Sequence, residues 1–162
     1  MTNIIQVVGY KNAGKTTLVE NMVRALTEAG YAVGTVKHDG HRFDIDHEGT
    51  DTWRHREAGA SMTAITSANR TVMMEEKPVE LSALVQRMAT MDIVVVEGFK
   101  QEAYPKIVIV RREADKELLD NLSHIAAVVT WLPDIAFEGP IFSINRPDEL
   151  LAWYTQQLPS PR

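Results

Sequence analysis

The sequence predicts an α/β domain of three layers, in which helices cover a mainly parallel sheet and a β-hairpin extends from it. Short apolar, β-branched runs alternate with segments of helical spacing, which is typical of strand–helix–strand units. The pattern G-x-x-x-x-G-K-[ST] occupies residues 9–16, between the first predicted strand and the first predicted helix. Together these two observations predict the fold of P-loop NTPases.

Length and composition fit a single domain over residues 1–162. The chain is 44% hydrophobic and 24% charged, and it contains no cysteine, which excludes disulfides, thiolate metal sites and a cysteine nucleophile. Its formal net charge of −5 argues against a nucleic-acid partner, which would need a basic surface. The sequence has no long apolar stretch and no signal pattern at the N-terminus, so we expect no membrane association and a cytoplasmic location.

The N-terminal part supplies two strands and the helix between them. Residues 4–8 form a β-branched run that predicts a strand ending at Gly9. Apolar residues with helical spacing predict a helix over 15–29, which Gly30 would terminate. Residues 31–36 then predict the second strand.

The next part predicts a short helix and a hairpin after a polar loop at 39–49. Thr50 is expected to cap a helix that ends at Ala58. Residues 62–67 and 71–74 have strand character, and the three residues between them suit a tight connection. This hairpin is the predicted extension of the fold.

The C-terminal half continues the alternation of helices and strands. Pro78 is expected to open a helix that runs to about Ala89. The nearly continuous apolar run at 92–97 predicts a strand covered on both faces. Further strands are predicted at 107–110, 125–130 and 141–144, before a closing helix from Pro147.

The glycine-rich segment has a mechanical reason to bind phosphate. Its glycines let backbone amides curl around an anion, and the helix that follows directs its positive end at the same point. Lys15 would reach the β- and γ-phosphates, and the Thr16 hydroxyl would bind Mg²⁺. The predicted phosphate-binding residues of this segment are Gly9, Asn12, Ala13, Gly14, Lys15, Thr16 and Thr17.

A carboxylate at the end of a neighbouring strand would complete the metal site. Ligands of parallel sheets bind at the C-terminal ends of the strands. Glu97 lies at that end of the 92–97 strand, whereas Asp92 lies at the opposite end. We therefore expect Glu97 to contribute to Mg²⁺ binding and Asp92 to be a boundary residue.

The polar loop after the second strand is rich in groups that bind phosphate or metal. Lys37, His38 and His41 are further predicted phosphate-binding residues, and Asp44 is a further candidate for the metal. In P-loop proteins this segment commonly faces the γ-phosphate and changes order with the nucleotide state. A solvated loop without a ligand, or a histidine metal site, would also explain this composition.

The residues do not decide which base is bound. The segment after the 125–130 strand lacks the Asn-Lys-x-Asp pattern of common guanine-specific proteins, and Asp134 alone is weak evidence for guanine. No residue is identified as a catalytic group, because neither a water-positioning glutamine nor an arginine finger can be named.

Three segments resemble the MobB family of molybdopterin-guanine dinucleotide biosynthesis adaptor proteins. They are residues 9–18, residues 36–60 with their His/Asp loop and Ala-Gly-Ala ending, and residues 95–100. The resemblance implies a GTP-binding protein with Mg²⁺, weak GTPase activity and a homodimeric state, whose hairpin would be a sensible dimer element. It also implies molybdopterin guanylyltransferase and molybdopterin as partners, so that the protein acts mainly as an adaptor.

Two other functions remain compatible with the residues. A small-molecule kinase on the same fold would use Asp44 or Asp46 as a base near the γ-phosphate. A metal or cofactor carrier would instead use His38, His41 and His47.

Overall fold

The computed structural model describes residues 2–161, which form two compact units. Residues up to His38 and from Leu84 onward make up the first unit, and residues 39–83 make up the second. Each unit has its own sheet, so each is described by itself below.

The first unit is built on a six-stranded parallel sheet in the order β2-β5-β1-β6-β7-β8. Its central strands, β5 and β6, are buried along their whole length, as their continuous apolar runs predict. The strands are β1 (Asn3–Val8), β2 (Val33–Lys37), β5 (Ile93–Glu97), β6 (Lys106–Val110), β7 (Ile125–Thr130) and β8 (Ile141–Ser143).

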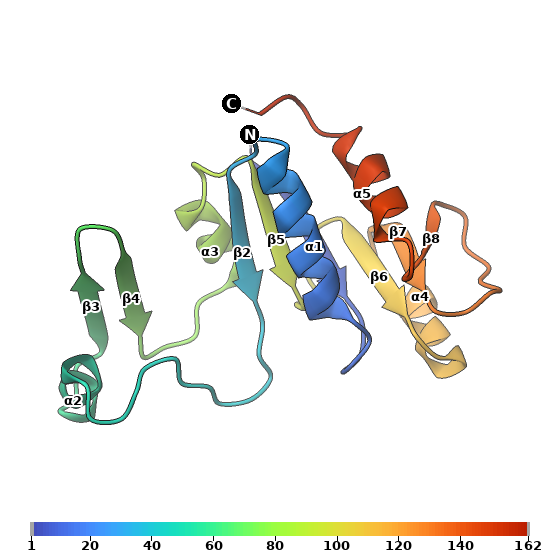
Figure 1. Ribbon diagram of the computed structural model, residues 1–162. Coiled ribbons are helices and arrows are strands. Elements are labelled where there is room, and N and C mark those ends of the chain that lie inside the picture. The colour runs from blue at the N-terminus through green and yellow to red at the C-terminus, as the bar shows by residue number, and fades with distance from the viewer. Residues whose placement is uncertain (1, 162) are drawn as a thin grey trace. The chain divides into compact units, whose positions relative to one another are not determined.

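Helices cover both faces of this sheet, which makes the predicted three layers (Figure 1). The helices α1 (Lys15–Glu28) and α5 (Pro147–Thr155) pack on one face, through residues such as Leu18, Met22 and Leu150. On the other face α4 (Glu117–Asn121) packs through Leu118. The predicted fold class is therefore confirmed for this unit.

The second unit contains the hairpin and one short helix. The strands β3 (Met62–Thr66) and β4 (Thr71–Glu75) pair antiparallel, and α2 (Asp51–Glu57) contacts β3. The Thr50 hydroxyl accepts a hydrogen bond from the Trp53 amide over 3.3 Å, so the predicted cap of α2 is confirmed. The hairpin is the extension that the sequence predicts.

Two helical segments differ from the sequence prediction. The helix α3 spans Leu81–Arg87, three residues later than predicted, and its end tightens into turns such as Met88 N–H to Val85 O at 2.9 Å. The sequence analysis missed the 3₁₀ turn η1 (Glu113–Lys116) and α4. Both depend on Asp115, whose buried carboxylate accepts hydrogen bonds from the Arg111 and Arg112 amides, each over 3.1 Å.

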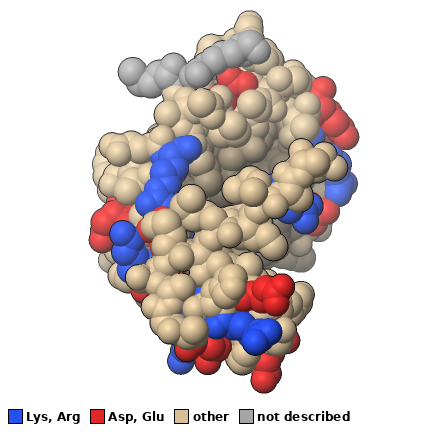
Figure 2. All heavy atoms as spheres, turned by 90° about the vertical axis from the view of Figure 1, so that its left-hand side faces the viewer, with Lys and Arg blue, Asp and Glu red and all other residues tan. Residues whose placement is uncertain are grey.

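One face of the molecule shows no large patch of a single charge. On the face drawn in Figure 2, basic and acidic side chains are interspersed among a larger uncharged area. Within residues 2–161, every helix is too short or too polar to cross a lipid bilayer.

Candidate functional site

The predicted phosphate-binding segment connects the end of β1 to the start of α1, in the middle of the parallel sheet. Gly14 is the N-cap of α1 and has a φ of 105°, a left-handed conformation that favours glycine. No side chain caps this helix end. Because the first amides of a helix lack partners within it, this end can donate hydrogen bonds to an anion.

Lys15 supplies the positive charge of this loop. Its ammonium group donates a hydrogen bond to the Tyr10 carbonyl over 2.8 Å, which holds the side chain back along the loop. Burial lowers the pKa of Lys15, and the charges of Lys100 and Lys37 act in the same direction, whereas Glu97 opposes them. Three lysines and one carboxylate therefore share this region, and an added anion would be stabilised there.

Two side chains that the sequence analysis missed hold the outer side of the loop. Arg111 donates a hydrogen bond to the Asn12 carbonyl, and the Trp131 indole N–H donates to the Ala13 carbonyl over 3.2 Å. The Arg111 guanidinium also lies over the Trp131 ring, 5.3 Å from its centre. These two hydrogen bonds fix the Asn12 and Ala13 carbonyls and so hold the backbone of the loop. Arg111 and Trp131 directly follow the strands β6 and β7. This position at the ends of buried strands is the feature of the sequence that could have indicated a role in the site.

The predicted metal-binding edge lies where α1 meets the end of β5. The Thr16 hydroxyl donates a hydrogen bond to Glu97 Oε1 over 3.0 Å, and Lys37 Nζ lies 3.8 Å from the same oxygen. Glu97 is buried, and the hydrogen bond from Thr16 holds its carboxylate toward the loop. Hydroxyl and carboxylate oxygens are ligands that Mg²⁺ accepts, alongside phosphate and water. These residues thus fit the ion that a nucleoside triphosphate brings.

Asp92 lies at the other end of β5 and has a structural contact there. Its Oδ2 accepts a hydrogen bond from the Ala32 amide over 2.8 Å, which ties the start of β2 to the start of β5. This contact is what the interpretation of Asp92 as a boundary residue predicts.

A cavity of about 430 Å³ opens beside Lys15, over the ends of β1 and β5. Its rim combines aromatic and cationic groups: the His38 and Phe99 rings lie 4.7 Å apart, and Lys100 Nζ lies 4.5 Å from the centre of the Tyr10 ring. The lining residues are Gly9, Lys15, His38, Gly98, Phe99, Lys100, Gln101 and Glu102. The structure thus brings the predicted residues Gly9, Lys15 and His38 together.

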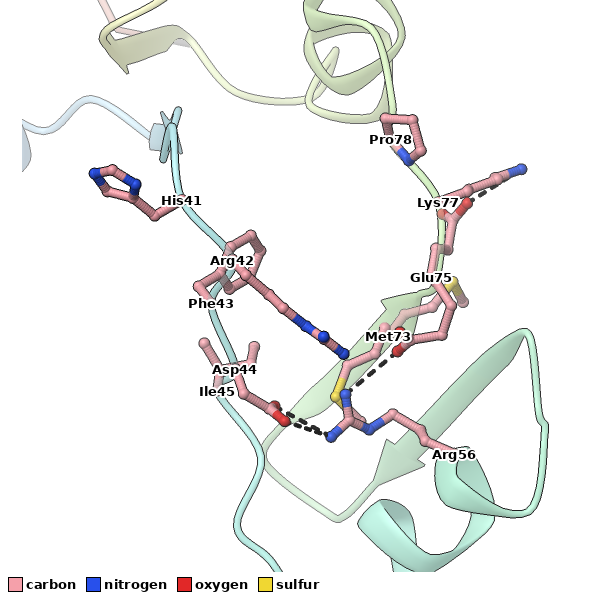
Figure 3. A pocket seen from close by; sticks show the side chains of 12 residues that line it. His41, Arg42, Phe43, Asp44, Ile45, Arg56, Met73, Glu75, Lys77 and Pro78 are labelled. Atoms are coloured by element: carbon pink, nitrogen blue, oxygen red, sulfur yellow. Dashed lines mark hydrogen bonds and ion pairs between the residues drawn. The ribbon is translucent and has the colours of Figure 1, made fainter.

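The other two predicted residues of the polar loop, His41 and Asp44, belong to the hairpin unit. There the Asp44 carboxylate accepts two hydrogen bonds from Arg56 Nη2, over 2.8 and 3.1 Å (Figure 3). These bonds hold the pKa of Asp44 below its usual range. Arg56 also lies 3.5 Å from Asp46 and 3.3 Å from Glu76, so it joins the polar loop, α2 and the segment after β4.

A second cavity, of about 680 Å³, lies within this hairpin unit. Figure 3 shows Arg42 and Arg56 directed into it, between the polar loop on one side and β4 on the other. The described histidine, aspartate and glutamate side chains include no group of three or more placed to hold a metal ion.

The segment after β7 is the part of the chain that the sequence analysis considered for contact with the nucleotide base. The Leu132 amide donates to the Thr130 hydroxyl over 2.9 Å, which turns the chain directly after β7. Asp134 is exposed two residues further on.

Comparison with known proteins gives one consistent family. The profile of the family described as molybdopterin guanine dinucleotide synthesis protein B, MobB, matches residues 4–131. A molybdopterin-guanine dinucleotide biosynthesis adapter protein from Haemophilus influenzae is 37% identical over 147 residues, which are 88% of this chain and 82% of the relative. The adapter protein of the same name from Escherichia coli is 34% identical over 82% of this chain and 81% of its own.

Solved structures agree with these sequence matches. A crystal structure of a MobB protein homolog from Bacillus stearothermophilus has a TM-score of 0.79 and 36% identity, covering 96% of this chain and 97% of the other. The crystal structure of Bacillus subtilis MobB has a TM-score of 0.81 and 30% identity, covering 97% and 98%. The similarity therefore includes both units of the chain.

Proposed function

This chain belongs to the MobB family of molybdopterin guanine dinucleotide synthesis proteins, and from that premise we propose that it is a GTP-binding accessory protein in molybdenum-cofactor biosynthesis. The observation that carries the proposal is the Thr16–Glu97 hydrogen bond of 3.0 Å beside an uncapped helix end and Lys15. This arrangement supports binding of a nucleoside triphosphate with Mg²⁺. The guanine preference and the pathway come from the relatives, whose names refer to molybdopterin-guanine dinucleotide biosynthesis.

Each part of the site has a role in holding the nucleotide. The amides of residues 14–17 bind the β- and γ-phosphates, whereas the Ala13 amide donates to the Tyr10 carbonyl over 3.3 Å and closes the loop. Lys15 leaves the Tyr10 carbonyl to join the phosphates. Thr16 and Glu97 would hold Mg²⁺, directly or through water, and the bound ion would supply positive charge to the phosphates. Lys37 and His38 follow β2 and extend the positive side of the cavity.

Hydrolysis by this site alone is slow in our proposal. Arg111, the arginine at the phosphate-binding loop, already donates to the Asn12 carbonyl and stacks over Trp131. It is therefore engaged in holding the loop and is not free to serve as an arginine finger. Such a residue raises rates by about 10³–10⁵. A weak GTPase suits an adaptor whose partner consumes the nucleotide.

The partners in this proposal are molybdopterin, molybdopterin guanylyltransferase and a second copy of this chain. The hairpin unit exposes Met62, Ile65 and Met73, each more than half accessible. A two-stranded sheet is marginal without cover, which favours a homodimer built through this hairpin. We place the protein in the cytoplasm, where these partners would be met.

A reconstituted reaction tests the proposed function. Formation of molybdopterin-guanine dinucleotide is followed with guanylyltransferase, molybdopterin and GTP·Mg²⁺, with and without this protein. We expect the wild type to increase the rate or the yield, and Lys15→Ala to remove the increase. Equal product formation with wild type, with Lys15→Ala and without the protein would contradict the proposal.

A further inference from the structure

The connection between β5 and β6 is a loop that crosses β1 where a helix would be usual. It begins where the Gly98 amide donates to the Val7 carbonyl over 3.0 Å, and it ends where the Gln6 amide donates to the Pro105 carbonyl over 2.9 Å. Residues 98–105 form turns and irregular backbone. Carbonyls of such a segment need partners other than a helical neighbour when they lie against a sheet.

Two wholly buried polar side chains supply those partners from the sheet. Gln6 and Lys106 are neighbours in the β1–β6 register, and both are 0% exposed. Gln6 Nε2 donates to the Gly98 carbonyl over 3.0 Å and to the Phe99 carbonyl over 2.7 Å. Lys106 Nζ donates to the Tyr104 carbonyl over 3.1 Å and also to the Glu102 carbonyl.

Burying these two groups is costly, so their presence requires a reason. Desolvation lowers the pKa of Lys106, which reflects the cost of a charged group inside the sheet. The Gln6 Oε1 atom is buried and has no hydrogen-bond partner among residues 2–161, so the side-chain amide is used for donation alone. Apolar residues would pack at these positions at lower cost, but they would leave the loop carbonyls unbonded.

The loop held in this way forms the wall of the cavity beside Lys15. Gly98 and Phe99 have φ values of 94° and 56°, consecutive left-handed conformations that strain Phe99 in particular. This turn places the Phe99 ring against His38 and the next residue, Lys100, over Tyr10. The charge of Lys100 reaches Lys15 and lowers its pKa.

We propose that Gln6 and Lys106 are positioning residues that fix the 98–105 crossover as the wall of the nucleotide pocket. They set nucleotide affinity through Phe99 and Lys100 without touching the nucleotide. The inference rests on the proposed nucleotide site, and it assigns a function to two buried polar residues in otherwise apolar strands.

The test measures nucleotide affinity and amide hydrogen exchange in variants whose new side chains are close in size to the original ones. GTP·Mg²⁺ affinity is measured by calorimetry for Lys106→Met and Gln6→Met, each alone and combined with Lys100→Ala. Val128→Ala is the control, because Val128 is a fully buried residue on the same face of the sheet, in β7. Amide hydrogen exchange over residues 98–104 is followed in the same proteins without nucleotide.

We expect each methionine variant to bind GTP about tenfold more weakly, because the loop must then be ordered at the moment of binding. Exchange over residues 98–104 should accelerate, whereas Val128→Ala should leave both readouts unchanged. The loss should shrink in the Lys100→Ala background, since the effect is transmitted through that residue. If Lys106→Met does not fold, the inference is tested with Gln6→Met alone. We expect Gln6→Met to fold, because it removes the unpartnered buried oxygen together with the donor.

Unchanged affinity or unchanged exchange in a folded variant would overturn the inference, and so would losses that simply add to that of Lys100→Ala. These outcomes differ from a failure of the proposed function. In that case wild type and Lys15→Ala would bind GTP equally poorly, while the exchange measurement would still report whether Gln6 and Lys106 hold the loop.

Discussion

The Thr16 hydroxyl donates a hydrogen bond of 3.0 Å to Glu97 Oε1, which joins the first turn of α1 to the end of β5. The two residues lie 81 positions apart in the sequence. They meet because β1 and β5 are neighbours in a parallel sheet, so both strands end at the same edge. The same two side chains are the proposed holders of Mg²⁺.

Removing either partner should abolish the benefit of Mg²⁺ for nucleotide binding. Thr16→Val keeps the shape of the side chain, and Glu97→Gln keeps its size but not its charge. We expect GTP affinity in Mg²⁺ to fall by about tenfold or more in each, the scale of one interaction with a charged group. Affinity measured in a chelator is the control, and it should change little. A variant that retained the wild-type response to Mg²⁺ would exclude that residue from the metal site.

Replacing Trp131 by phenylalanine should weaken nucleotide binding through the loop backbone. The change keeps an aromatic ring under Arg111 but removes the indole N–H that bonds the Ala13 carbonyl. We expect a loss of about three- to tenfold in GTP affinity, since one hydrogen bond contributes about 1 kcal/mol. Trp153→Phe, which alters a partly buried tryptophan of α5, is the matched control. Equal affinities in both variants would show that Trp131 does not order the loop.

Nucleotide affinity should decrease with rising pH earlier than an ordinary lysine would predict. Burial lowers the pKa of Lys15 from its model-compound value of 10.5, so the free protein loses this proton at a lower pH. A bound triphosphate favours the charged form, and binding therefore becomes weaker as Lys15 deprotonates. Calorimetry across the alkaline range should show this decrease in wild type and a flatter profile in Lys15→Arg. Identical profiles would contradict the role of Lys15.

Acid should loosen the polar loop of the hairpin unit. Hydrogen bonding from Arg56 depresses the pKa of Asp44 in the folded chain. Its contribution to stability is therefore present above the unfolded pKa, about 3.9, and is lost as pH falls through the lower folded value. Arg56→Met should cause the same loosening at neutral pH, seen as faster amide exchange at residues 44–47. Arg54→Met, on the same helix, should not.

The sequence predicted the elements whose patterns are local and failed where distant contacts decide. The loop at 9–16, its flanking strand and helix, and the Thr50 cap all follow from periodicity and capping residues. The η1–α4 segment has a polar sequence with Leu118 as its buried contact, and its turn is fixed by Asp115, so periodicity gave no signal. The late start of α3 was also not predicted, because Pro78 alone does not determine the residue at which the helix begins.

The residues of the site also divide into those placed by local patterns and those placed by distant contacts. Lys15, Thr16 and Glu97 were predictable, because a motif and a strand end place them. Arg111 and Trp131 were not, since their role depends on β6 and β7 ending beside the loop. Lys106 and Gln6 were not identified from the sequence, because the carbonyls that they bond lie in a loop with no periodic pattern.

A GTP site at the 9–16 loop can be tested by calorimetric titration of GTP and ATP, each with Mg²⁺, into wild type and Lys15→Ala. We expect the wild type to bind GTP in preference to ATP, and the variant to lose that binding. Preference for ATP would favour a small-molecule kinase, and GTP binding that survived Lys15→Ala would show that the nucleotide lies elsewhere.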